Sequence, residues 1–139
     1  MIDEYNFLVP KIDQKYKDEA VTSSDNPVSI VLTTIAASAD AAALGRTLVE
    51  ERLAACVNIL PAMTSIYRWQ GRIETEPEQQ LLIKTASSRV ADLERRLHEL
   101  HPYEVPEFLV LRAGDHGGPY MSWVQACVGD PDQPPGPNV

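Results

Sequence analysis

The sequence predicts a small α+β domain in which strands and helices follow the order β-α-β-β-α-β, with one more helix at the end. Three observations predict it: a charge-free run rich in β-branched residues, two segments whose apolar residues recur at helical spacing, and two extended segments joined by Gln70-Gly71. We place this domain in residues 28–128. We expect a flexible acidic arm in residues 1–27 and a proline-rich tail in residues 129–139.

The first half of the domain begins with a predicted buried strand over residues 28–36, VSIVLTTIA. An amphipathic helix of about four turns follows, with Ser38 or Asp40 as its cap. The residues that recur at helical spacing are Ala41, Leu44, Leu48, Val49 and Leu53. A second strand over residues 55–60 is interrupted by Pro61, where we expect a bulge or kink.

A long bent hairpin is predicted next. Its first limb covers residues 64–70, its turn is Gln70-Gly71, and its return limb covers residues 72–85 with an interruption, a second bulge or kink, at the Glu-Pro-Glu sequence. Because side chains alternate along a strand, Tyr67 and Trp69 should lie on the same face of the hairpin.

The second half of the domain is predicted to contain a helix over residues 90–100, a strand over residues 107–112 and a helix over residues 120–128. Ser87 or Ser88 is the expected cap of the first of these helices. Its exposed side should carry two i,i+4 ion pairs, Asp92–Arg96 and Arg95–Glu99.

This order of elements is that of the ferredoxin-like, split βαβ sandwich. Right-handed crossovers place both helices on one face of an antiparallel sheet, which leaves the other face partly bare. A domain of about 100 residues with long apolar strands rarely leaves such a face in water. We therefore expect the chain to self-associate through this face or through the hairpin.

Composition excludes several classes of partner. The formal net charge of −8 argues against nucleic acid, because affinity for a phosphate backbone comes from Lys and Arg. No apolar stretch reaches the ~18 residues of a membrane span, and residues 1–15 lack the pattern of a secretory signal. Cys56 and Cys127 form no C-x-x-C and predict reduced thiols. We expect a cytoplasmic protein without membrane or nucleic-acid partners.

Motifs of common catalytic and nucleotide-binding chemistry are missing from the sequence. It contains no P-loop, no G-x-G-x-x-G and no Ser or Cys nucleophile with an evident His and acid arrangement. The sequence therefore does not predict an ordinary nucleotide-binding loop or a nucleophilic catalytic site of these kinds.

The segment 101–107, HPYEVPE, places His101, Glu104 and Glu107 at intervals of three. Its two prolines exclude the helix on which these three side chains would share a face. His101 is therefore interpreted in one of two ways. It either joins metal ligands from elsewhere, since imidazole suits Cu²⁺ and Zn²⁺, or it interacts with the C-terminal end of the preceding helix.

Other candidate residues also have two interpretations. Cys56 is either a small buried hydrophobe or a metal ligand, while Cys127 is expected to be structural. Tyr67 and Trp69 predict either an interface or a pocket wall. Lys84, within an apolar strand, either lies in a pocket or protects an edge strand from aggregation.

Several motifs together resemble the CutA family, also called divalent cation tolerance proteins, and the resemblance covers residues 28–128 in order. These motifs are LVEERLAACVNILP at 48–61, TSIYRWQGRIE at 64–74, LLIKT at 81–85, HPYEVPEFLVL at 101–111 and YMSWV at 120–124. The resemblance implies a ferredoxin-like subunit in a stable homotrimer, similar to that of the PII signalling proteins. In that trimer the long hairpins pair between subunits.

The resemblance also implies a set of site residues. Cys56 and His101 match positions associated with metal in the family. Thr33 stands where some bacterial members carry a further cysteine, which disfavours tight Cu(I) binding. A pocket near the subunit boundary would be lined by Tyr67, Trp69, Lys84, Tyr103 and Glu107.

Three functions follow as expectations. The first is a non-enzymatic homotrimer that binds divalent metal ions weakly, Cu²⁺ ahead of the others, and contributes to the response to metal ions. The second is a PII-like sensor that binds a small anionic or nucleotide ligand in an inter-subunit pocket. The third is a trimeric scaffold that presents its terminal arms to a protein partner.

Overall fold

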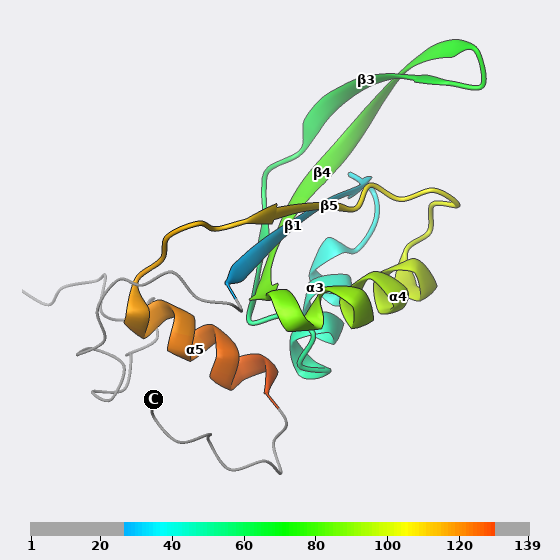
Figure 1. Cartoon of the computed structure of the whole chain (residues 1–139). Helices are drawn as coiled ribbons and strands as arrows, with labels where there is room; N and C mark the ends of the chain where they lie inside the picture. Colours follow the sequence, from blue (N-terminus) through cyan, green and yellow to red (C-terminus); the bar gives the residue numbers. More distant parts are fainter. Residues whose placement is uncertain (1–26, 130–139) are drawn as a thin grey trace, which may run out of the picture.

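An antiparallel five-stranded sheet carries the fold in the computed structural model, which describes residues 27–129 (Figure 1). The predicted arm and tail lie outside the described residues, apart from Pro27 and Gly129. The strands have the order β2-β4-β1-β5, and β3 pairs with the outer half of β4. Their bounds are β1 Val28–Ala36, β2 Cys56–Ile59, β3 Met63–Trp69, β4 Arg72–Ala86 and β5 Leu109–Arg112. The order of elements along the chain is the predicted one.

The core lies between one face of the sheet and two helices, α3 Ala41–Glu50 and α4 Val90–Leu100. Alternate residues of the strands point into it, as the two-residue period of a strand requires. Its members include Val31, Ile35, Leu44, Leu48, Leu81, Ile83, Leu93 and Leu97. A third helix, α5 Gly118–Val128, packs with a separate apolar cluster at the end of the sheet away from the hairpin (Figure 1).

The opposite face of the sheet has an apolar area that no helix within the described residues covers, although α5 buries one end of this face. Ile30 and Leu32 of β1 lie opposite Leu111 and Leu109 of β5, and both β5 side chains are about half exposed. Leu82 of β4 lies beside Leu32 on the same face. We call these five residues the bare face. Its existence agrees with the prediction that both helices lie on one side of the sheet.

The hairpin of β3 and β4 projects beyond the body of the molecule (Figure 1). Ile59 pairs with Leu81 while Met63 pairs with Glu78, so the first limb contains one extra residue around Pro61. The predicted bulge at this proline is confirmed.

The predicted interruption of the strand at Pro77 is wrong. Pro77 pairs with Thr64 in an uninterrupted ladder, and its carbonyl accepts a hydrogen bond from the Ala37 N–H over 3.0 Å. Its nitrogen points to the same side, away from β3, because the N–H and C=O of one strand residue face the same neighbour. The missing N–H therefore removes no hydrogen bond from the hairpin.

Helix ends differ from the prediction in two places. Asp40 caps α3 as expected, but α3 ends at Glu50 and not near Leu53. Arg52 has a φ of 59°, and the N–H of Leu53 bonds to the Leu48 carbonyl, which together form a Schellman ending. Ser87 does not cap α4. Its hydroxyl donates to the Pro27 carbonyl, and a short 3₁₀ turn precedes the helix.

Two further expectations about the second half are corrected. The ion pairs of α4 have i,i+3 spacing, Arg95–Asp92 and Arg96–Glu99, since Arg96 also turns toward Glu51. The last strand begins at Leu109, two residues late, because the His101 side chain occupies the Thr34 carbonyl, which a longer β5 would need. No helix in the described part of the chain is long and apolar enough to span a membrane.

Candidate functional site

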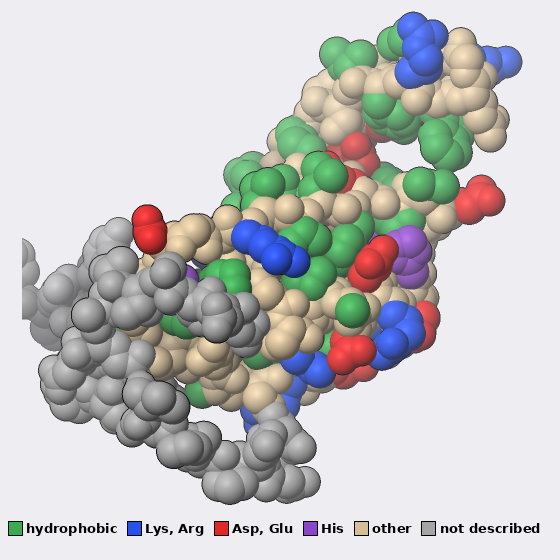
Figure 2. Space-filling model, viewed as in Figure 1, with side chains coloured by type: hydrophobic (Ala, Val, Ile, Leu, Met, Phe, Trp, Pro, Cys, Tyr) green, Lys and Arg blue, Asp and Glu red, His purple; other side chains and the backbone are tan. Residues whose placement is uncertain are grey.

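A groove lies between the projecting hairpin and the segment 103–107, which connects α4 to β5. Figure 2 shows the molecule hollowed beneath the hairpin, and the cavity has a volume of about 680 Å³. Thr34 of β1 and Gln80 of β4 also line it. These two residues pair with one another on the side of the sheet that carries the bare face, so the groove opens next to uncovered apolar surface.

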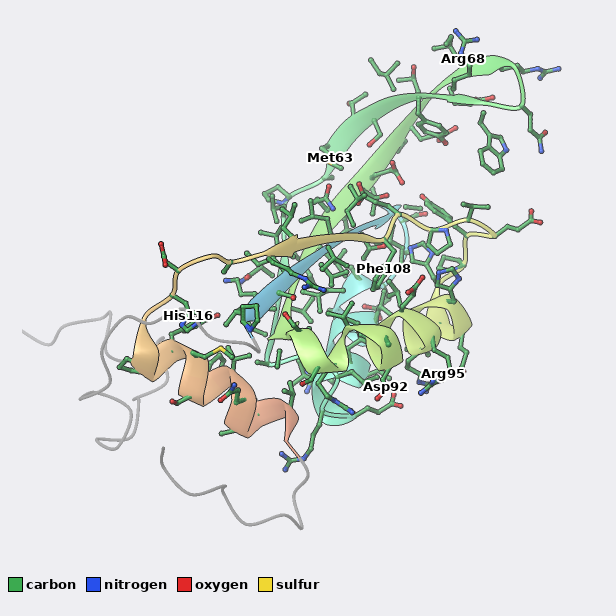
Figure 3. All side chains as sticks on the ribbon, viewed as in Figure 1. Met63, Arg68, Asp92, Arg95, Phe108 and His116 are labelled. Atoms are coloured by element: carbon green, nitrogen blue, oxygen red, sulfur yellow. The ribbon has the colours of Figure 1, made fainter. Side chains whose placement is uncertain are left out.

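The hairpin wall of the groove is produced by strand alternation. Met63, Ser65, Tyr67 and Trp69 are successive same-face residues of β3, and all four line the groove. Figure 3 shows Met63 at the base of the hairpin and Arg68, whose side chain belongs to the other face, near the tip. The arrangement of Tyr67 and Trp69 agrees with the expected alternation.

The facing wall is held in place by two hydrogen bonds to β4. The Tyr103 hydroxyl donates to the Glu78 carboxylate over 2.8 Å, and the Gln80 side-chain amide donates to the Glu107 carboxylate over 3.0 Å. The same Gln80 amide donates to the Thr33 carbonyl over 2.7 Å. These bonds fix the segment 103–107 opposite the aromatic side chains of the hairpin.

The groove is acidic. Glu78, Glu104 and Glu107 line it, and its described lining contains no lysine, arginine or histidine. Glu78 is only 6% exposed, yet none of the ion pairs found within residues 27–129 includes it. A buried carboxylate without a cationic partner has lost hydration that a single neutral hydrogen-bond donor does not fully replace.

This negative charge acts on two tyrosines of the groove. Burial, followed by the hydrogen bond to Glu78, raises the pKa of Tyr103. Desolvation, followed by the charges of Glu76, Glu78 and Glu74, raises the pKa of Tyr67. Both phenols are therefore neutral hydrogen-bond donors at physiological pH, and the polar groups of the groove favour a positively charged ligand.

His101 stands next to the groove, directly after α4, and is 7% exposed. Its Nε2 atom lies 2.7 Å from the Thr34 carbonyl oxygen, and its Nδ1 atom accepts the Tyr103 N–H over 3.0 Å. These partners require a neutral ring protonated on Nε2. Burial lowers the pKa of His101, which agrees with that state. A metal ion would have to displace one of these bonds to bind the imidazole.

Cys56 and Lys84 lie away from the groove. The Cys56 Sγ atom lies 3.8 Å from the Asn58 Oδ1 atom, and Cys56 pairs with Lys84 across the sheet. Lys84 belongs to the part of β4 between β2 and β1, so the interpretation as an edge-strand charge is wrong. Lys84 is also not among the residues that line the groove.

The predicted site residues thus fall into two groups. The groove brings together Tyr67, Trp69, Tyr103 and Glu107 within a single chain. Cys56 does not lie beside His101. Cys56 pairs with Lys84 of β4. Thr34, whose carbonyl bonds to His101, pairs with Gln80, four residues earlier on the same strand. Within residues 27–129, no group of three or more His, Cys, Asp or Glu side chains is arranged to hold a metal ion.

Sequence reasoning missed Glu78 and Gln80. The Glu-Pro-Glu sequence predicts an interruption of the strand, although it belongs to one continuous ladder. A register that pairs Met63 with Glu78 places the Glu78 side chain on the face of Tyr67. Residues paired across a hairpin share a face, so the alternation of side chains along β3 also predicts which residues of β4 face the groove. This pattern identifies Glu78.

Most of this chain is similar to known proteins. The family model described as CutA1 divalent ion tolerance protein matches residues 29–127. A curated relative, the divalent-cation tolerance protein CutA of Thermus thermophilus, is 43% identical over 100 residues, which cover 72% of this chain and 97% of that protein.

Solved structures agree with the sequence comparison. CutA from Synechococcus elongatus has a TM-score of 0.73 at 34% identity and covers 79% of this chain and 96% of its own. The Thermus thermophilus divalent cation tolerance protein has a TM-score of 0.70 at 42% identity and covers 73% of this chain and 99% of its own. The antiparallel sheet and three helices described above therefore match CutA structures, and the chain belongs to the CutA1 divalent ion tolerance protein family.

Proposed function

We propose that this chain works as a non-enzymatic homotrimer that binds divalent cations weakly, Cu²⁺ ahead of the others, and contributes to the response to them. The acidic groove carries the proposal, because three glutamates line one cavity whose described lining has no basic side chain. Carboxylate oxygens are common ligands of divalent ions, and Cu²⁺ binds most tightly of the first-row series at a given site. The description of the family supports the same function.

Two sets of residues are candidate ligands of the ion. His101 and Cys56 are the ligands predicted from the sequence. The geometry favours the groove, since Glu78 has no cationic partner within the described residues while both ring nitrogens of His101 bond to the backbone. Coordination that uses carboxylates without a complete ligand set implies modest affinity.

Calorimetric titration with Cu²⁺ distinguishes these ligands. The wild type is compared with Glu78→Gln, His101→Ala and Cys56→Ala, with Glu94→Gln on exposed α4 as the matched control. We expect the largest loss of affinity in Glu78→Gln, because the amide keeps the size of the side chain and removes its charge. Unchanged affinity in Glu78→Gln would exclude the groove. A loss confined to His101→Ala or Cys56→Ala would assign binding to the ligands predicted from the sequence.

Assembly into a homotrimer of ferredoxin-like subunits belongs to the same proposal. Its support is the bare face, where Leu109 and Leu111 are about half exposed, together with the projecting hairpin, whose Ile66 and Ile73 are exposed. Apolar surface of this extent on a small domain favours contact with another chain. Two free cysteines support a reducing compartment, and we propose the cytoplasm.

A second candidate function is a PII-like sensor that binds a small ligand in the groove. The observation that favours it is the convergence of Tyr67, Trp69 and Tyr103 around a cavity of about 680 Å³. This volume lies within the range of ordinary small-molecule sites. Its test is a thermal-shift screen of metabolites, in which a hit on the wild type that is lost in Trp69→Leu supports the sensor. The absence of any hit across a broad panel would contradict it.

A further inference from the structure

We propose that the groove binds a small organic cation, an ammonium or guanidinium compound, between its carboxylates and its aromatic side chains. The inference rests on the second candidate function, in which the groove is a ligand site, and names the chemical class of the ligand. It replaces the anionic ligand expected from the sequence. Lys84, the basic residue on which that expectation depended, does not line the groove, whereas three glutamates do.

The charge of the ligand follows from Glu78. This carboxylate is 6% exposed and lines the groove, and it accepts a hydrogen bond from the neutral Tyr103 hydroxyl. No ion pair within the described residues neutralises it. An anion removed from water to this extent is stabilised by a cation held against it. Glu104, on the facing wall, adds a second negative group for the same ligand.

The organic nature of the ligand follows from the aromatic side chains. Tyr67 and Trp69 line the groove from β3 and are 41% and 44% exposed in the single chain, so part of each residue is open to a ligand there. Tyr103 lines it from the facing segment. Aromatic faces attract alkylammonium and guanidinium groups through their quadrupoles, and arginine-like groups also stack on them. A groove that offers only carboxylates would suit an inorganic ion. Aromatic walls add affinity for a cation that carries apolar surface.

The test uses agmatine, which has a guanidinium group at one end and an ammonium group at the other. Calorimetry measures its affinity for the full-length wild type, for Glu78→Gln, for Tyr67→Leu and for Trp69→Leu, with Glu94→Gln as the matched control. We expect Glu78→Gln to weaken binding by about tenfold or more and each aromatic variant by about threefold or more. Glu94→Gln should bind as the wild type does, and glutarate, an anion of similar length, should not bind.

A second measurement locates the ligand. Each of the two tryptophans gives one indole N–H signal in NMR spectra, and Trp123 belongs to the cluster around α5. Agmatine should shift the Trp69 signal and leave that of Trp123 in place. Circular dichroism confirms that the variants fold, which is expected because Tyr67 and Trp69 are half exposed on the projecting hairpin.

Copper titration of the same variants separates this inference from the divalent-cation proposal. The aromatic variants should keep the Cu²⁺ affinity of the wild type and bind agmatine more weakly, since the carboxylates and not the aromatic rings would coordinate the metal ion. Absence of agmatine binding by the wild type would overturn the inference, and so would equal binding by the wild type and the aromatic variants. Neither result would alter the Cu²⁺ affinities, on which the divalent-cation proposal stands.

Discussion

His101 joins three parts of the molecule through its two ring nitrogens. One nitrogen bonds to the Thr34 carbonyl of β1, and the other accepts the backbone N–H of Tyr103. The Tyr103 hydroxyl in turn bonds to Glu78 of β4. The neutral imidazole therefore positions the wall of the groove on which Tyr103 and Glu104 lie, whatever its role toward metal ions.

The protonation of His101 predicts a pH dependence of stability. Burial lowers its pKa below the ordinary value of 6.5, so folding favours the neutral ring. The stability that this ring contributes is complete above the ordinary pKa and is lost as the pH falls toward the lower pKa of the folded state. Protonation of Nδ1 would also break its bond with the Tyr103 N–H.

Thermal unfolding checks this prediction. The midpoint of the wild type should fall between about pH 7 and pH 5 by more than that of His101→Gln, which keeps a side-chain donor and cannot titrate. Parallel pH profiles of the two proteins would show that His101 is not the responsible group.

Thr33 gives a second prediction at the scale of a single residue. It is fully buried, and its hydroxyl has no hydrogen-bond partner within the described residues. Thr33→Val keeps the shape of the side chain and removes the unsatisfied group, so the free energy of unfolding should rise by about 1 kcal/mol. Chemical denaturation measures the change. Destabilisation by Thr33→Val would mean that the hydroxyl has a partner in the assembled protein.

The hairpin turn shows, at the scale of an element, how local backbone geometry places the groove. Gln70 has a φ of 48° and Gly71 a φ of 79°, which is the pattern of a two-residue type I′ turn. This turn sets the register in which Trp69 pairs with Arg72 and Met63 with Glu78. The aromatic and acidic sides of the groove therefore depend on one turn.

A substitution in this turn should stabilise the protein. Glutamine is unusual at positive φ, whereas asparagine tolerates it and is common at the first position of a type I′ turn. Gln70→Asn should raise the free energy of unfolding by about 0.5 kcal/mol. Gly71→Ala, which places a Cβ atom at positive φ, should lower it by about 1 kcal/mol. The opposite order in denaturant titrations would contradict the assigned turn.

Most elements were predictable because their signals are local. The β-branched run of β1, the apolar stripes of α3 and α4, and the bulge at Pro61 follow from short-range patterns. Features that depend on distant partners were not. The start of β5 is set by His101, which occupies the Thr34 carbonyl of β1, and the place of Glu78 in the groove is set by the register of the hairpin. The uninterrupted strand at Pro77 depends on which neighbour its nitrogen faces.

The whole molecule presents the bare face and the groove on the same side of the sheet. Leu32 and Thr34 are same-face neighbours on β1, the first on the bare face and the second in the groove. A second chain that covers Leu109 and Leu111 would therefore lie next to the groove. Assembly and ligand binding are consequently expected to influence one another.

A charged substitution on the bare face should disrupt assembly. Leu111 is 52% exposed in the single chain, so Leu111→Lys should cost the isolated fold little, while a lysine buried between chains without a partner is costly. Light scattering should report three times the chain mass of 15.4 kDa for the wild type and a smaller mass for Leu111→Lys. Val49→Lys, which alters a similarly exposed residue of α3, is the control and should remain trimeric. A monomeric wild type would contradict the proposed assembly.

The central claim is that the acidic groove holds a cation in the assembled protein. A crystal structure of the full-length protein soaked with Cu²⁺, with anomalous diffraction recorded at the copper edge, tests it most directly. We predict an anomalous peak within coordination distance of a carboxylate oxygen of Glu78, Glu104 or Glu107, in a groove next to a second chain. A peak confined to Cys56 or His101, or no peak in the groove, would contradict the claim.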